Sequence, residues 1–204
     1  MLYRIIPFSL ILGVLATAAS AEDDPHAHHR QHAKQKVESA ALATVNLSNT
    51  SLVNQHGKTV GLKDDVIGKR IAVVTFAYTT CTTVCPVVSA IFSQVNKKLA
   101  GHVGKDVELV TITVDPNRDT PARLLAYSKK HGAGDGWSWL TGKKDNVIQA
   151  LNTFGAYTVN FEDHPAMVLV GDAENNKWYR FYGFASPDVI ADKVRELLKQ
   201  RKQG

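Results

Sequence analysis

The two cysteines of this 204-residue chain, Cys81 and Cys85, lie four residues apart. They follow an apolar run, 71–78, whose β-branched residues are typical of a buried strand. A helix beginning at this point would hold both thiols near its first turn, where unpaired N–H groups and the helix dipole favour the thiolate. Two thiols in this setting can bind a soft metal, or form and break a disulfide.

A purely structural disulfide is the weaker interpretation of this pair. Positions i and i+4 of a helix can be bridged, because a disulfide suits Cα atoms about 5–6 Å apart. The loop closed here would be so short that the chain-entropy model assigns the bridge roughly 2 kcal/mol, against over 4 for one that joins distant segments. The pair is therefore better suited to redox or metal chemistry than to stabilising the fold.

The first 21 residues have the pattern of a secretory signal peptide. Arg4 precedes an apolar stretch, 5–19, and small residues at 19–21 provide a cleavage site after Ala21. The bacterial style of this signal predicts a periplasmic protein. The 17-residue stretch 5–21 also reaches the lower limit for a membrane span, so the alternative is an uncleaved anchor in the inner membrane, with the protein facing the periplasm.

Residues 22–41 are predicted to form a flexible leader, because they are too poor in large apolar side chains to fold alone. The leader contains four closely spaced histidines: His26, His28, His29 and His32. Such a cluster could weakly bind a borderline metal such as Cu(II), Zn(II) or Ni(II), while the plainer interpretation is a polar linker.

The formal net charge of +5 is modest and the basic residues are scattered, with a group near the C-terminus. That group consists of Lys193, Arg195, Lys199, Arg201 and Lys202. A solvated helix end explains it, and the sequence has no basic stripe with interleaved aromatic residues. Nucleic-acid binding is therefore not expected.

Residues 42–204 have the length of a single domain. Apolar and β-branched runs predict strands at 43–47, 51–55, 70–77, 107–114, 166–170 and 177–182, and the 3–4 spacing of apolar residues predicts helices at 85–99, 121–131, 146–154 and 186–200. The order β-α-β-α-α-β-β-α, after a short β lead-in, predicts an α/β fold with helices on both faces of a central sheet. Such sheets place their binding sites at the carboxyl ends of their strands. The cysteine pair lies at this position, between the end of a strand and the start of a helix.

Four segments, in order, resemble the signatures of the Sco/SenC proteins, which are thioredoxin-like copper chaperones of respiratory oxidase assembly. They are Cys-x-x-x-Cys-Pro at 81–86, Asp-Pro-x-x-Asp-Thr-Pro at 115–121, Trp-x-x-Leu-Thr-Gly at 137–142, and an Asp-His pair at 163–164 before an apolar strand. The resemblance covers about residues 39–200. It implies a thioredoxin-like three-layer sandwich, in which a central mixed sheet is flanked by helices and preceded by extra N-terminal strands.

By position, the resemblance implies that Cys81, Cys85 and His164 are copper ligands. Thiolates suit Cu(I), and an imidazole nitrogen lets the same site hold Cu(II). Asp163 or Asp115 could orient His164 from outside the ligand sphere, since metal-bound histidines usually have such a partner.

Capping and turn formation explain Asp115 and Asp119 more simply than metal contact, with Asp119 or Thr120 as the cap of the helix that begins at Pro121.

The sequence departs from the family pattern at two positions. Thr82 follows the first cysteine, where many members have proline, and Pro165 follows His164, where serine is more usual. In thioredoxin-like folds a proline before this strand is often cis and faces the cysteines, so Pro165 could shape the backbone for thiol exchange.

Three functions compete. A copper chaperone would pass copper by ligand exchange to the copper-site subunit of a cytochrome c oxidase or to another copper chaperone, and a periplasmic thiol reductant would keep its cysteines reduced. A thiol–disulfide oxidoreductase would reduce the oxidase's copper-site cysteines, with Cys81 attacking and Cys85 resolving. A sensor of copper or redox state would use the same residues. A peroxiredoxin-like peroxidase is disfavoured, because Tyr78 stands where its proline is expected.

Overall fold

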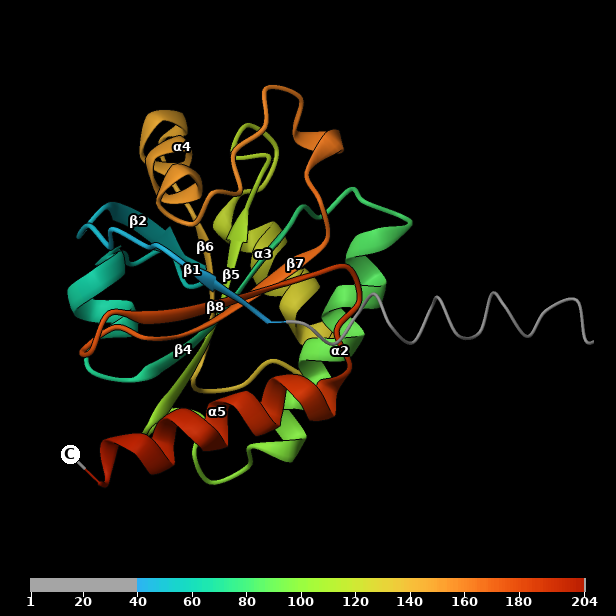
Figure 1. Cartoon of the computed structure of the whole chain (residues 1–204). Helices are drawn as coiled ribbons and strands as arrows, with labels where there is room; N and C mark the ends of the chain where they lie inside the picture. Colours follow the sequence, from blue (N-terminus) through green and yellow to red (C-terminus); the bar gives the residue numbers. More distant parts are fainter. Residues whose placement is uncertain (1–39, 204) are drawn as a thin grey trace, which may run out of the picture.

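Strands and helices alternate through residues 40–203, which are the residues that this computed structural model describes (Figure 1). The strands are β1 Ala41–Ala43, β2 Ser51–Asn54, β3 Thr59–Gly61, β4 Ile71–Ala77, β5 Val107–Thr113, β6 Trp137–Thr141, β7 Met167–Asp172 and β8 Lys177–Tyr182. The helices are α2 Val84–Lys98, α3 Pro121–Lys130, α4 Lys144–Thr153 and α5 Pro187–Arg201, with a π-helix η1 at Leu62–Ile67 and a 3-10 turn η2 at Phe161–Asp163. The predicted signal segment and all but the last residues of the predicted leader lie outside the described residues.

An eight-stranded mixed sheet forms the centre, in the order β1-β8-β7-β4-β5-β6-β2-β3. The three strands β4, β5 and β6 run parallel, and the remaining neighbours pair antiparallel. Parallel pairing requires a crossover, which α2 supplies between β4 and β5 and α3 between β5 and β6. The carboxyl ends of β4 and β5 therefore meet at one edge, where the cysteine loop begins.

Two apolar cores, one on each face of the sheet, produce the predicted three layers. Ile71 and Val73 of β4 join the core under α2, α3 and α5, whereas Ala72 and Val74 join the core under α4 and η1. This alternation follows from the two-residue period of a strand, and burial on both faces explains why β4 is apolar throughout. Figure 1 shows α4 and α5 on opposite sides of the sheet.

The sequence does not predict β6, the third parallel strand. The prediction passed from the helix at 121–131 directly to the helix at 146–154, so its element order was wrong at this point. β6 has only five residues, and its inward-facing Trp137 and Trp139 are interrupted by Ser138, whose hydroxyl donates to the buried Glu108 carboxylate at 2.6 Å. Because Ser138 interrupts the apolar run, and its hydrogen-bond partner lies on the neighbouring strand, the density of apolar residues does not identify 137–141 as a strand.

The N-terminal strand was also misplaced. The structure has no strand at 44–50; β1 is an edge strand that pairs with β8 for three residues and ends at Ala43. The chain then leaves the sheet edge, and Val45 enters the core under α4 and η1. The prediction at 51–55 is confirmed by β2, which pairs with both β3 and β6.

Helix ends agree with the predicted signals. The Thr120 hydroxyl accepts the Arg123 N–H at 3.3 Å, and the Ser186 hydroxyl accepts the Val189 N–H at 3.3 Å, so these two residues cap α3 and α5. Among residues 40–203, no helix is both long enough and apolar enough to cross a bilayer.

The C-terminal basic group is not merely a solvated helix end. The Arg201 guanidinium forms a two-point ion pair with the buried carboxylate of Asp172, with Nε 2.6 Å from Oδ2. Asp172 is the last residue of β7, so this pair fastens the end of α5 to the sheet. The expectation of a purely solvated role was wrong for this arginine.

Gly171 is required by the close approach of a tryptophan. A Cβ atom at this position would lie 2.0 Å from Cε3 of Trp178, its neighbour across the β7–β8 ladder. We expect Gly171→Ala to lower the free energy of unfolding by about 1–3 kcal/mol, because the buried ring must shift. Urea denaturation measures this change. Gly134→Ala is the matched control, since a Cβ there meets nothing within 4 Å; equal losses in both variants would contradict the explanation.

Candidate metal-binding site

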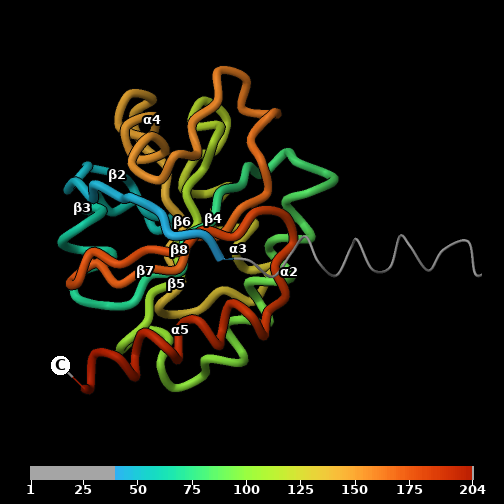
Figure 2. Tube along the Cα trace, viewed as in Figure 1, coloured from blue at the N-terminus to red at the C-terminus, as the bar shows by residue number. Residues whose placement is uncertain are grey.

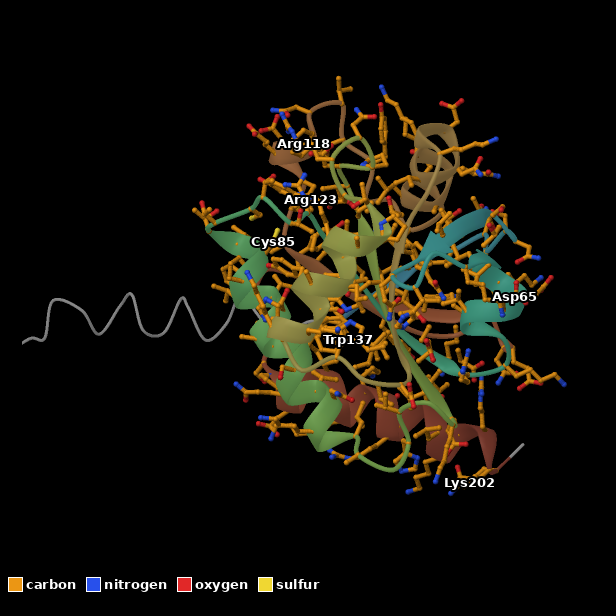
Figure 3. All side chains as sticks on the ribbon, turned by 180° about the vertical axis from the view of Figure 1, so that it is seen from behind. Asp65, Cys85, Arg118, Arg123, Trp137 and Lys202 are labelled. Atoms are coloured by element: carbon orange, nitrogen blue, oxygen red, sulfur yellow. The ribbon has the colours of Figure 1, made fainter. Side chains whose placement is uncertain are left out.

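The two cysteines lie where β4 passes into α2. Cys81 is in the loop after β4 and is 8 % exposed, whereas Cys85 is in the first turn of α2 and is 1 % exposed. Both are free thiols in this structure. Figure 3 places Cys85 near one end of the molecule, on the side of Arg118 and Arg123, and Lys202 toward the opposite end.

The sulfur of Cys81 caps helix α2. The N–H of Cys85 donates to Cys81 Sγ at 3.2 Å, while the residue in the N-cap position, Thr83, makes no capping hydrogen bond with its side chain. The sulfur thus satisfies one of the N–H groups that a helix start leaves unpaired. A thiolate is the better acceptor, so this contact favours ionisation of Cys81.

The same contacts give the two thiols very different acidities. Burial opposes ionisation of Cys81, but hydrogen bonds from the Cys85 thiol and from the N–H groups of Cys85 and Thr83 outweigh burial and lower its pKa to about 7. For Cys85, burial and the hydrogen bond to Cys81 raise the pKa to about 12. Near neutral pH Cys81 therefore exists partly as the thiolate, while Cys85 remains protonated.

Tyr78 connects the cysteine loop to the loop that carries His164. Its carbonyl accepts the Cys81 N–H at 3.2 Å, and its ring meets those of Phe161 and His164 edge-on, with centroids 5.0 and 6.0 Å away. Burial, followed by the charge of Cys81, raises the pKa of Tyr78 to about 12. Sequence reasoning missed this role; the only available signal was an aromatic residue directly after a buried strand.

His164 is oriented by a backbone carbonyl. Its Nδ1 lies 2.9 Å from the Phe161 oxygen, which can only accept, so Nδ1 carries the proton and Nε2 keeps its lone pair for a metal. The aspartates considered for this task lie elsewhere, since Asp163 is exposed and Asp115 pairs with Arg118 at 3.2 Å. The backbone carbonyl of Phe161 thus orients His164, a role that the sequence analysis assigned to Asp163 or Asp115.

The described residues do not hold a finished metal cage. Within 40–203, no three side chains of His, Cys, Asp or Glu converge closely enough to bind a metal ion. The structure brings Cys81 and Cys85 together and places His164 against Tyr78. In Figure 2 the orange loop before β7 rises at the same end of the molecule as the green loop that joins β4 to α2. The cis form considered for Pro165 is not found, because the described chain has no cis peptide bond.

Asp119 has a place that the sequence did not indicate. It does not cap α3, a task that Thr120 performs; its buried carboxylate instead accepts hydrogen bonds from Thr79, in the cysteine loop, and Thr113, at the end of β5. These partners are 40 and six residues away in the chain, so no local motif points to them.

A cleft of about 250 Å³ lies beside the site. Phe161 lines it together with the β5–α3 loop and the apolar face of α4, and Tyr157 and Val159 contribute from the loop before η2. Val159 is 96 % exposed and Tyr157 41 %. The cleft next to the His164 loop is therefore accessible, with exposed apolar side chains at its rim and polar residues such as Asp115 and Lys144 in its lining.

The fold is that of a thioredoxin-like protein, with two free cysteines where a central strand passes into a helix. The sequence profile of the SCO1/SenC family matches residues 43–199, so this chain belongs to the SCO1/SenC family.

Curated relatives agree with this assignment. The SCO1 protein homolog of Bacillus subtilis is 32% identical over 106 residues, which are 50% of this chain and 53% of that protein. A putative copper-binding protein of Stutzerimonas stutzeri is 29% identical over 104 residues, 46% of this chain and 50% of that one. These matches span only about half the length of either relative. Protein SenC of Rhodobacter capsulatus is 28% identical over 192 residues, covering 90% of this chain and 84% of its own.

Solved structures show the same fold. Arabidopsis thaliana ScoI with copper bound superposes with a TM-score of 0.64 at 23% identity, covering 78% of this chain and 99% of its own. BsSco is described as a member of the Sco family of cytochrome c oxidase assembly proteins. It also superposes with a TM-score of 0.64, at 24% identity, covering 78% of this chain and 96% of its own. The expected thioredoxin-like sandwich is therefore confirmed.

The difference in acidity between the thiols can be tested by alkylation of the reduced, metal-free protein. Iodoacetamide should modify Cys81 with a rate that is half-maximal near pH 7, its pKa, and should spare Cys85, whose pKa is about 12. Mass spectrometry of the modified peptides measures both rates. Cys85→Ala should move the Cys81 midpoint to higher pH, since the thiol donor is lost, and Cys85→Ser should move it less. Equal modification of the two cysteines would contradict the assignment.

Proposed function

We propose that this chain is an extracytoplasmic copper-delivery protein. It binds one copper ion through the sulfurs of Cys81 and Cys85 and Nε2 of His164, and passes the ion to the copper-site subunit of a cytochrome c oxidase during assembly. The observation that carries the proposal is the orientation of His164, whose Nδ1 is bound to the Phe161 carbonyl so that Nε2 is left for a metal, on a loop that contacts Tyr78 of the cysteine loop.

The donor set fits copper. Two thiolates and one imidazole suit Cu(I), and the nitrogen allows Cu(II) in the same place. The hydrogen bond from His164 Nδ1 to Phe161 fixes the tautomer that a metal-bound histidine needs. Support also comes from relatives, since Sco proteins of Arabidopsis thaliana, Bradyrhizobium japonicum and yeast have been solved with copper bound.

Delivery would proceed by ligand exchange from the exposed side of the site. Cys81 and His164 are 8 % and 9 % exposed, whereas Cys85 is 1 % exposed, so an incoming thiol reaches the first two ligands before the third. Loading requires both cysteines to be reduced, which in an oxidising compartment calls for a thiol reductant. A periplasmic location follows from the signal-like segment 1–21, and a relative from Bacillus anthracis is described as a lipoprotein.

Thiol–disulfide exchange is the second candidate, and the unequal acidities favour it specifically. A thiol with a pKa near neutrality attacks efficiently, and a buried, protonated neighbour can resolve the mixed disulfide once it is exposed. BsSco is described as having a disulfide switch. In this case His164 would tune the attacking thiol without binding copper.

An anaerobic copper titration of the reduced protein separates the two candidates. To exclude the histidine-rich leader, all variants carry alanine at positions 26, 28, 29 and 32. We expect one tightly bound copper per chain, with an affinity that falls at least about tenfold in Cys81→Ser, Cys85→Ser and His164→Ala, because each variant removes a ligand. Competition with a Cu(I) chelator measures the affinity. Tight binding that survives His164→Ala would reject the three-ligand site and favour thiol exchange.

Partner contact can be separated from copper binding at Val159. This side chain projects from the rim of the cleft, so Val159→Glu should weaken binding to the oxidase subunit by about tenfold while leaving copper affinity unchanged. Titration calorimetry with the soluble subunit domain measures the interaction. Ala100→Glu adds the same charge on an exposed residue after the far end of α2 and should bind normally. Equal weakening by both substitutions would show that the effect is only one of charge.

A further inference from the structure

Asp119 is a fully buried carboxylate between two loops, with 1 % of its surface exposed. The N–H of Thr79 lies 3.2 Å from both of its oxygens, the Thr79 hydroxyl donates to Oδ1 at 2.5 Å, and the Thr113 hydroxyl donates to Oδ2 at 2.5 Å. None of the ion pairs formed by residues 40–203 includes it. Hydrogen bonds from neutral donors, and not an ion pair, therefore compensate the burial of this carboxylate.

The hydrogen bonds to Asp119 fix the turn that ends at Cys81. Residues 78–81 form this turn, which the Cys81 N–H closes on the Tyr78 carbonyl at 3.2 Å. Thr79, the second residue of the turn, is bound to Asp119 through both its backbone and its side chain. Thr113 ends β5, which pairs with β4 in the centre of the sheet, so Asp119 connects the turn to a central strand. Asp119, which belongs to the loop after β5, therefore helps to fix the position of Cys81, which belongs to the loop after β4.

The carboxylate also places a negative charge near the proposed metal position. Thr79 is two residues from Cys81, a separation of at most roughly 7 Å along an extended chain, and Asp119 contacts Thr79 directly. Because Asp119, Cys81 and Cys85 are all buried, such a charge is screened less here than it would be in bulk water. A doubly charged ion gains twice as much from it as a singly charged ion does.

We infer that Asp119 is a positioning and selectivity residue of the copper site: it holds the Cys81 turn in place, and its buried charge favours Cu(II) over Cu(I). The inference rests on the proposed function, since it assumes that copper binds beside Cys81. The carboxylate touches neither thiol in the described hydrogen bonds and acts through Thr79 and through its field.

Two neutral substitutions test the charge. In Asp119→Asn and Asp119→Ser, the affinity for Cu(II) should fall about tenfold more than the affinity for Cu(I). The reduction potential of the bound copper should then rise by about 59 mV, the equivalent of a tenfold change for one electron. Thr79→Val removes a hydroxyl but keeps the charge, so its ratio of affinities should equal that of the wild type. An unchanged ratio in both neutral variants would overturn the selectivity role.

Hydrogen exchange of the metal-free protein tests the positioning. The Thr79 amide should exchange at least about tenfold faster in both Asp119 variants, and also faster in Thr79→Val, while the Val74 amide in β4 remains protected. Unchanged exchange at Thr79 would overturn the positioning role. Faster exchange at Val74 as well would show general unfolding and overturn it too. Absence of copper binding in the wild type would reject the proposed function, while the exchange result would still decide the positioning role.

Discussion

The short contact between the Cys85 N–H and the Cys81 sulfur is the interaction on which the site depends. It ends the loop after β4, starts helix α2, and orients the two thiols relative to each other. It also contributes to the difference in acidity: burial raises the pKa of Cys85, whereas Cys81 accepts hydrogen bonds from the thiol and the N–H of Cys85, which lower its pKa. A side-chain oxygen at the N-cap, as in α3 and α5, would start the helix equally well. It would not provide the N–H hydrogen bond that lowers the pKa of Cys81.

The sheet supplies the rigid frame for this contact. Parallel pairing of β4 with β5 brings the cysteine loop next to the β5–α3 loop, where the Val114 N–H donates to the Ala77 carbonyl at 3.0 Å. The histidine loop arrives from the other neighbour of β4, the antiparallel strand β7. Three loops from three adjacent strands thus meet at one edge, and Tyr78 and Phe161 fill the space between them.

Local sequence patterns predicted the parts of the molecule that are determined locally. The buried strands β4 and β5, helix α2, and the capped starts of α3 and α5 follow from apolar spacing and capping residues within a few positions. β6 escaped because Ser138 interrupts a five-residue strand and is satisfied only by Glu108 on the neighbouring strand. Cys81, Cys85 and His164 could be named from motifs, but Asp119 and Phe161 could not. Their roles depend on hydrogen bonds that only the folded chain brings together.

The capping sulfur also couples the redox state of the pair to the order of the helix. In a disulfide the Cys81 sulfur has lost its negative charge and is a poor acceptor, so oxidation removes a cap, and losing a cap typically costs a helix about 1 kcal/mol. By thermodynamic linkage, interactions that hold the first turn of α2 in its helical conformation favour the dithiol over the disulfide. The fold therefore favours the reduced form of the cysteine pair over the disulfide.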